Sequence, residues 1–212
     1  MRNNSVKKLA MNGLMIALVF LTTYFTRIPT PLPGGYFNLG DAVIMLAAAF
    51  LGPIGGLIAG SIGSAFADLA AGAFIFAPIT LVVKGIEGLV VGLLAANYIK
   101  ANGLKQAVSI QTLNNQTLNN QALNSSLLDD KQPKGTRSNL NLILALAVGA
   151  IIMVAGYFSG EAFVLSLFDK SFGIVAAAGE LVANFVQGGL SAILAYFLIL
   201  VLSRVGIQKY ID

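Results

Sequence analysis

Two reactive side chains are missing from this chain, which contains no cysteine and no histidine. Without cysteine, disulfides, thiol redox chemistry and cysteine-ligated metals are excluded. Without histidine, the chain lacks a serine–histidine dyad, a histidine-ligated zinc and the commonest general base. The sequence also has no Gly-x-x-x-x-Gly-Lys-Ser/Thr phosphate loop, so we expect no ATP hydrolysis of the usual kind. We therefore expect no enzyme, no cofactor and no bound metal.

Charged residues are also scarce, at 10% of the chain, whereas a soluble domain has about 25%. Hydrophobic residues make up 57% of the sequence, and the mean hydropathy is +0.81. The net charge is +4, but the basic residues flank apolar segments and form no patch. This distribution favours charges that set membrane topology over a nucleic-acid surface. The composition predicts a protein whose main partner is the lipid bilayer.

Hydrophobic segments predict the fold class, an all-α integral membrane protein with six transmembrane helices. The expected helices cover residues 9–25, 39–51, 54–71, 78–98, 140–158 and 174–204. The first would be about 25 Å long, enough to cross a bilayer, and it lacks a convincing signal-peptide cleavage site. Gly52-Pro53 should break the helix between the second and third segments, because proline cannot continue the hydrogen bonding. Alternatively, these two segments form one re-entrant hairpin, which leaves four crossings.

Lysine and arginine predict that both termini are cytoplasmic. The cytoplasmic side would receive Arg2, Lys7, Lys8, Lys100, Lys105, Lys131, Lys134, Arg137, Arg204 and Lys209. The outside would receive only Arg27 and Lys170. The polar link 101–138 carries a near-repeat of five residues that starts at Gln111, a period that fits neither helix nor strand. We expect this link to be a disordered cytoplasmic linker within a single membrane domain, residues 1–212.

Lys84 and Glu87 lie inside an apolar segment long enough to cross the bilayer. A charge at membrane depth costs about 2.5–3.5 kcal/mol on insertion scales, so it is rare unless it is paired or lines a cavity. At a spacing of three residues the two side chains share one helical face. The simplest interpretation is a structural ion pair of Lys84 with Glu87 or with Glu180. The alternative is that these charges bind a ligand.

Other polar residues are predicted to lie at the same membrane depth as Lys84 and Glu87, and they favour the ligand-binding interpretation. Glu180, Asn184 and Gln187 are spaced i, i+4, i+7 and share one face of the last helix. Tyr157 and Glu161 lie four residues apart near the predicted outer end of the fifth helix. The predicted substrate-binding residues are therefore Lys84, Glu87, Tyr157, Glu161, Glu180, Asn184 and Gln187. Acidic residues outnumber the single lysine, which favours a neutral or weakly basic ring compound.

The connection between the first two helices contains Tyr36, Phe37 and Asn38. The two aromatic side chains are predicted either to form a lid over an outward-facing pocket or to anchor the chain at the membrane interface. Asn38 is a candidate cap of the second helix, and Asp41 would then lie near the positive end of the helix dipole. Asp68 ends the third helix, where interfacial solvation suffices to explain it.

Small residues form stripes at four-residue spacing. Gly52, Gly56, Gly60 and Ser64 should allow close internal helix packing, as should Gly88 and Gly92. In the first helix, Ala10, Gly13 and Ala17 form a similar stripe. That stripe either packs internally or is a docking surface for a partner membrane protein.

Together these motifs resemble a known family. The matching features are Tyr36-Phe-Asn-Leu-Gly-Asp41, Leu51-Gly-Pro53, Lys84-Gly-Ile-Glu-Gly88, Gly156-Tyr-Phe with Glu161, and Glu180 with Asn184 and Gln187-Gly-Gly. They are similar to the substrate-binding S components of energy-coupling factor (ECF) vitamin transporters, in the branch with hydroxymethylpyrimidine, pyridoxine and riboflavin S components. The resemblance covers nearly the whole chain except the link around 101–138.

The resemblance implies a prokaryotic cell-membrane protein that binds a small vitamin or precursor from outside. It further implies docking on a transmembrane coupling subunit driven by two cytoplasmic ATPases. The alternative from the residues alone is a stand-alone secondary transporter, with Glu87 or Glu180 as proton carrier. Inverted repeats would favour that alternative, and we see none that is convincing.

Overall fold

The computed structural model describes residues 2–30, 35–96, 98 and 135–205. The described part is mostly helical, with one pair of two-residue strands and short connections, which confirms the predicted all-α class. Its elements are α1 (Arg2–Phe25), β1 (Ile28–Pro29), β2 (Tyr36–Phe37), α2 (Gly40–Ala70), a helix over Ala77–Ala96, α4 (Gly135–Ser159), the π-helical turn η1 (Gly160–Val164), the 3-10 turn η2 (Leu165–Leu167) and α5 (Ile174–Val205). Strands β1 and β2 pair antiparallel, with Ile28 opposite Phe37.

Several predicted helix ends need correction. Helix α1 begins at Arg2, seven residues before the expected start at 9, because polar residues can extend a helix beyond its apolar part. Helix α4 begins at Gly135, so residues 135–138 of the predicted linker are helical. The rest of the linker lies outside the described residues. Beyond Ser159, helical structure continues through η1 and η2 to Leu167 instead of ending near 158.

Five helices in the described residues are long and apolar enough to cross a membrane: Val6–Phe25, Gly40–Ala70, Ala77–Ala96, Asn139–Leu167 and Ile174–Val205. Their outer faces are apolar, with large side chains such as Leu144, Val182 and Phe197 more than half exposed. Soluble monomers rarely expose apolar surface on this scale. The chain is therefore a multi-pass membrane protein, and the six predicted crossings remain a prediction.

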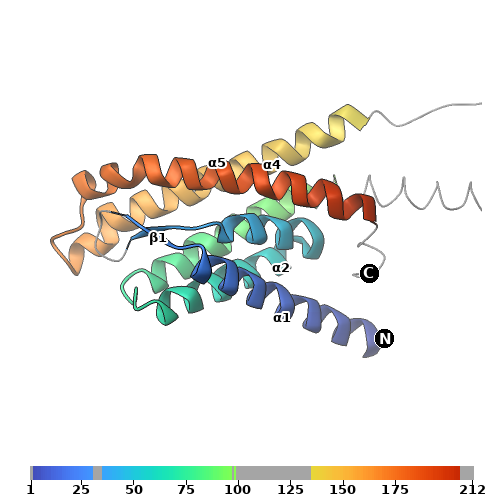
Figure 1. Ribbon diagram of the computed structural model, residues 1–212, viewed down its shortest axis with the longest axis horizontal. Helices are drawn as coiled ribbons and strands as arrows, with labels where there is room; N and C mark the ends of the chain where they lie inside the picture. The colour runs from blue at the N-terminus through green and yellow to red at the C-terminus, as the bar shows by residue number, and fades with distance from the viewer. Residues whose placement is uncertain (1, 31–34, 97, 99–134, 206–212) are drawn as a thin grey trace, which may run out of the picture.

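Helix α2 reverses direction at Gly52, so its two halves lie side by side. Gly52 has φ 78° and ψ −173°, a conformation that glycine adopts readily, and Pro53 starts the second half. A Cβ atom added to Gly56 would lie 2.6 Å from Cβ of Ala48, and one on Gly60 would lie 3.0 Å from Cγ2 of Ile44. The two halves thus correspond to the predicted segments 39–51 and 54–71. The hairpin is visible in Figure 1.

Small residues allow the second half of α2 to pack directly on the Ala77–Ala96 helix. A Cβ on Gly56 would lie 2.5 Å from the carbonyl oxygen of Gly88, and one on Gly92 would lie 2.6 Å from the nitrogen of Pro53. Such backbone contact excludes larger residues. The glycine stripes predicted to pack internally therefore do so.

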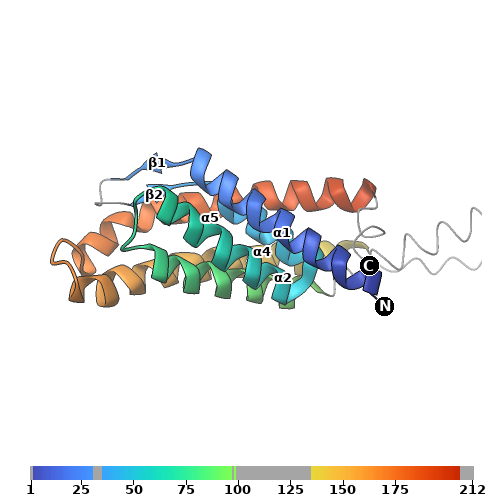
Figure 2. The ribbon, with the colours of Figure 1, turned by 90° about the horizontal axis from the view of Figure 1, so that it is seen from below.

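The bundle has two chemically different ends. Figures 1 and 2 place the start of α1, the start of α4 and the end of α5 at one end, and β1, β2 and the η2–α5 connection at the other. The first end carries Lys7, Lys8 and Arg204, whereas Arg27 and Lys170 lie at the second. This separation matches the charge bias from which the orientation was predicted. The polar site described next lies at the second end.

Candidate substrate-binding pocket

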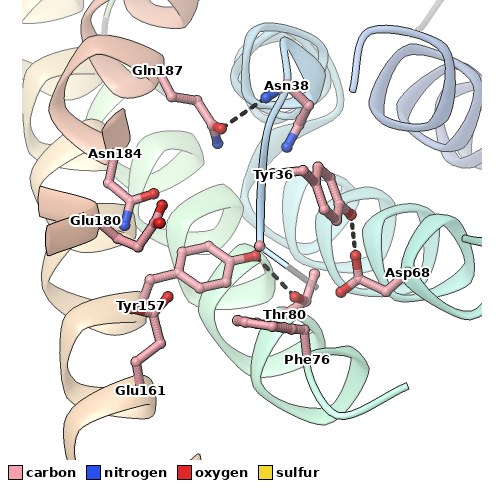
Figure 3. Close-up of a pocket in the computed structure, with 11 residues that line it drawn as sticks. Tyr36, Asn38, Asp68, Phe76, Thr80, Tyr157, Glu161, Glu180, Asn184 and Gln187 are labelled. Atoms are coloured by element: carbon pink, nitrogen blue, oxygen red, sulfur yellow. Dashed lines mark hydrogen bonds between the residues drawn. The ribbon is translucent and has the colours of Figure 1, made fainter. Parts of the chain in front are cut away.

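A polar pocket lies at the β1–β2 end of the bundle (Figure 3). Five parts of the fold contribute to it: the β2 segment, the end of α2, the start of the Ala77–Ala96 helix, the end of α4 with η1, and the first turns of α5. The lining residues are Gly35, Tyr36, Asn38, Asp68, Phe76, Thr80, Tyr157, Glu161, Glu180, Asn184 and Gln187. Polar groups that converge in a cavity are typical of small-molecule sites.

Helical spacing brings one wall together. Glu180, Asn184 and Gln187 lie on one face of α5, as predicted from their i, i+4, i+7 spacing. Tyr157 comes from α4, and Glu161 lies within η1, where the wider π-helical turn replaces the α-helix. Such turns are frequent at functional sites. Glu161 and Glu180 are only 3% and 5% exposed.

Tyr36 forms the opposite wall. Its hydroxyl donates a hydrogen bond to Oδ1 of Asp68, and Cζ of Arg27 lies 4.5 Å from the centre of its ring. Burial, and then the charge of Asp68, raise the pKa of the Tyr36 phenol above its ordinary value, so the hydroxyl stays a donor at neutral pH. Asp68 is 1% exposed, and no described residue donates to its Oδ2.

A third contact lies between these two walls. The hydroxyls of Thr80 and Tyr157 are 2.9 Å apart and share a hydrogen bond. Nζ of Lys84 lies 5.2 Å from the centre of the Tyr157 ring. Lys84 therefore lies directly behind the pocket and does not line it.

A buried network forms the floor. Oε1 of Gln187 accepts a hydrogen bond from the backbone N–H of Asn38 at 2.9 Å, and its Nε2 donates to Oδ2 of Asp41 at 2.9 Å. Oδ1 of Asp41 pairs with Lys84, whose Nζ also lies 3.4 Å from Oε2 of Glu87. Asp41 and Glu87 are both 0% exposed. The network thus joins the pocket to the packed core.

The sequence missed the main partner of Lys84. Of the two predicted alternatives, the ion pair with Glu87 is present, and Lys84 also pairs with Asp41, which comes from α2. Asp41 had been interpreted as a residue that stabilises the helix start. The predicted cap Asn38 is not the N-cap of α2, which is Leu39, but its Oδ1 accepts a hydrogen bond from the N–H of Gly40, the first helical residue, at 2.8 Å. Asp41 can still stabilise the helix dipole, but its burial is explained by the ion pair with Lys84.

Seven predicted residues line the pocket: Tyr36, Asn38, Tyr157, Glu161, Glu180, Asn184 and Gln187. Lys84 and Glu87 lie in the network below, and Phe37 is absent from the lining. Sequence analysis missed Gly35, Asp68, Phe76 and Thr80. Interfacial solvation is wrong for Asp68, because this side chain is buried under Tyr36. Its position two residues before the end of an apolar helix was the one available signal.

The predicted docking stripe on α1 faces away from the bundle. Ala10, Gly13 and Ala17 are exposed, and a Cβ on Gly13 would meet no described atom within 4 Å. Helix α1 instead buries Met15 and Val19 against α2. Within the described residues, the stripe is therefore not an internal packing surface.

A helical membrane bundle with an enclosed polar pocket at one end defines a class, the membrane proteins that bind a small polar molecule. The chain belongs to the ECF-type riboflavin transporter S component family, whose family model matches residues 3–132 and 119–204. The resemblance predicted from the motifs is thus confirmed. S components are substrate-binding subunits that work with partner subunits, which places this chain among transport proteins and not enzymes.

Individual relatives support the same grouping. A Pyrococcus woesei protein described as "Uncharacterized protein in gap 3'region" is 34% identical over 141 residues, which cover 66% of this chain and 69% of that protein. A UPF0397 protein of Lactococcus lactis subsp. cremoris is 40% identical over 68 residues, or 32% of this chain and 37% of that protein. A UPF0397 protein of Streptococcus agalactiae is 37% identical over 68 residues, with the same two shares. The chain thus spans little more than a third of the UPF0397 relatives it matches.

Proposed function

We propose that this protein is the high-affinity substrate-binding subunit of an ATP-driven ECF-type importer. It captures a small vitamin or precursor of the hydroxymethylpyrimidine, pyridoxine or riboflavin class from outside a prokaryotic cell. The observation that carries the proposal is the enclosed pocket, in which polar groups from five parts of the fold converge at one end of the bundle. Apart from the buried Lys84, Arg27 and Lys170 are the only basic residues near that end within the described part of the chain, which supports an outward-facing pocket.

Purified protein should bind one molecule of such a compound without ATP or an ion gradient, because the polar groups of the pocket already lie together at one end of the bundle. Isothermal titration in detergent with thiamine, pyridoxine, pyridoxamine and riboflavin measures affinity and stoichiometry. One-to-one binding of a panel member supports the proposal. Binding that appears only in sealed vesicles under a sodium or proton gradient would contradict it.

One observation favours a stand-alone secondary transporter as the second candidate. Glu87 is fully buried, and its carboxylate makes no hydrogen bond within the described residues beyond the ion pair of Oε2 with Lys84 at 3.4 Å. A buried carboxylate of this kind can carry a proton. In that case Glu87→Gln would abolish gradient-driven uptake by the chain alone in proteoliposomes. The importer proposal expects no such uptake in the absence of the coupling subunit and the ATPases.

The exposed stripe on α1 is our proposed docking surface for the coupling subunit. Gly13→Leu places a bulky side chain where two helices would otherwise approach closely. Vitamin uptake by cells should fall at least about tenfold, as expected if about 1.4 kcal/mol of docking energy is lost. Ligand affinity of the isolated protein should not change, because Gly13 has open space around it and is not among the residues that line the pocket.

A matched control exists on α5. Gly189 is exposed and also has no described atom within 4 Å of an added Cβ. Gly189→Leu therefore makes the same chemical change on another outward face, and it should leave uptake intact. Equal losses in uptake for both variants, or a loss of ligand affinity in Gly13→Leu, would contradict the proposal that this stripe is the docking surface.

A further inference from the structure

We infer that the pocket selects a ring compound that carries a protonated nitrogen. This inference rests on the proposed function and makes its substrate class more specific. The ammonium group would bind between the carboxylates of the pocket, and the ring would lie against the aromatic side chains.

The charge of the pocket wall is the first argument. Three carboxylates line the pocket, those of Asp68, Glu161 and Glu180, and no lysine or arginine does so among the described lining residues. The nearest ammonium, Lys84, is held by Asp41 and Glu87, two further carboxylates. Arg27 lies over the ring of Tyr36 and lines only the neighbouring cavity. The acidic groups around the site thus outnumber the basic ones, and an anionic ligand would add to that imbalance.

Unpaired oxygen atoms are the second argument. Oε2 of Glu161 has no hydrogen-bond partner within the described residues, although the side chain is only 3% exposed. Oδ2 of Asp68 likewise has no hydrogen-bond partner within the described residues, and the Asp68 side chain is 1% exposed. A buried carboxylate without a donor is costly, and an N–H donor with a positive charge relieves that cost best. Figure 3 shows Glu161 and Glu180 together on the wall opposite Asp68.

Aromatic rings complete the chemistry. Tyr36, Phe76 and Tyr157 contribute to the lining, and Figure 3 shows the Tyr36 and Tyr157 rings on opposite sides of the pocket. Aromatic faces attract cations and stack on flat rings. The same walls therefore suit both parts of a cationic ring compound.

Space for the ligand comes from a neighbouring cavity. The pocket as it stands has a volume of only about 30 Å³, room for one or two waters. A second cavity of about 200 Å³ is lined by Arg27, Thr30 and residues 71–73, and it shares Gly35 and Tyr36 with the first. Tyr36 is thus the partition between them. Moving its side chain would join the cavities and release Oδ1 of Asp68, which an ammonium could then occupy in place of the phenol.

The test uses two ligands that differ in one group. Pyridoxamine and pyridoxine share a ring, but pyridoxamine carries an aminomethyl ammonium where pyridoxine has a hydroxymethyl group. Titration at neutral pH should show at least about tenfold tighter binding of pyridoxamine, the ratio expected for about 1.4 kcal/mol. Glu161→Gln should reduce that ratio at least fivefold and change pyridoxine affinity much less. Asp169→Asn removes one negative charge from an exposed loop outside the pocket and should keep the ratio.

The outcomes separate the inference from the function on which it rests. Equal affinities for the two compounds overturn the inference, as does a pyridoxamine preference that survives Glu161→Gln. Tight binding of uncharged riboflavin with no binding of pyridoxamine also overturns it, and each of these results leaves the vitamin-binding function standing. A folded protein that binds neither pyridine compound, nor thiamine, nor riboflavin would contradict the proposed function itself.

Discussion

Lys84→Met should destabilise the folded protein by about 3–5 kcal/mol, because it leaves two buried carboxylates without their shared cation. Asp41 and Glu87 are both fully buried, and Lys84 contacts both of them. Methionine fills nearly the same volume, so the loss would come from charge and not from a cavity. Thermal unfolding in detergent, with the yield of monodisperse protein, measures the effect.

Removal of all three charges gives the internal control. The triple variant Asp41→Asn, Lys84→Met, Glu87→Gln keeps an acceptor at position 41 for Gln187 and orphans no charge. It should recover most of the lost stability, because interactions within one network are not additive. A triple variant as unstable as Lys84→Met would show that Lys84 acts through packing. A stable single variant would mean that the ion pairs contribute little.

Gln187→Leu should weaken ligand binding by at least about tenfold and lower stability by about 2 kcal/mol. Both ends of this buried amide are used, one by the backbone of Asn38 and one by Asp41. Leucine would leave the N–H of Asn38 unpaired and remove the link between the Tyr36 segment and α5. Ligand titration and thermal unfolding on the same preparation separate the two effects.

A second substitution at this position isolates the contact with Asp41. Gln187→Glu keeps an oxygen that can accept from Asn38, but it brings a carboxylate against Asp41. We expect a loss of stability at neutral pH that becomes smaller in acid, where the added carboxyl is protonated. Val186→Ala, on the exposed side of the same helix, should be neutral. If Gln187→Leu binds as tightly as the wild type, the floor network has no part in recognition.

Local spacing predicted much of the site. Glu180, Asn184 and Gln187 could be assigned to one face because the period of a helix is fixed. Asp41 was harder to assign: its sequence neighbours suggested a role at the helix start, and its real partner, Lys84, is 43 residues away. Asp68 was missed for the same reason, since only the folded chain brings Tyr36 over it. Long-range polar pairs leave no periodic signal in one sequence.

The fold, like the site, could be predicted only in part from the sequence. Hydropathy located every described helix, because a membrane span needs a long apolar stretch. Helix ends were less predictable: polar residues before residue 9 still form helix, and helical structure also continues after residue 158 through the π-helical turn that carries Glu161. Proline at position 53 correctly predicted the break in α2. Whether the two halves each cross the bilayer depends on their surroundings, which hydropathy does not describe.

The reversal at Gly52 also limits the length of helix that lies below the bound molecule. From Asp41, just below the pocket, to Gly52 the first half of α2 rises only about 17 Å, at 1.5 Å per residue. The hydrocarbon core of a bilayer is about 30 Å thick. The first half of α2 is therefore shorter than the barrier that a transported ligand must cross. Beside the network of Asp41, Lys84 and Glu87 lies a packed apolar core that includes Met45, Leu142 and Leu146, so delivery to the cytoplasm requires the partner subunits to open or bypass both.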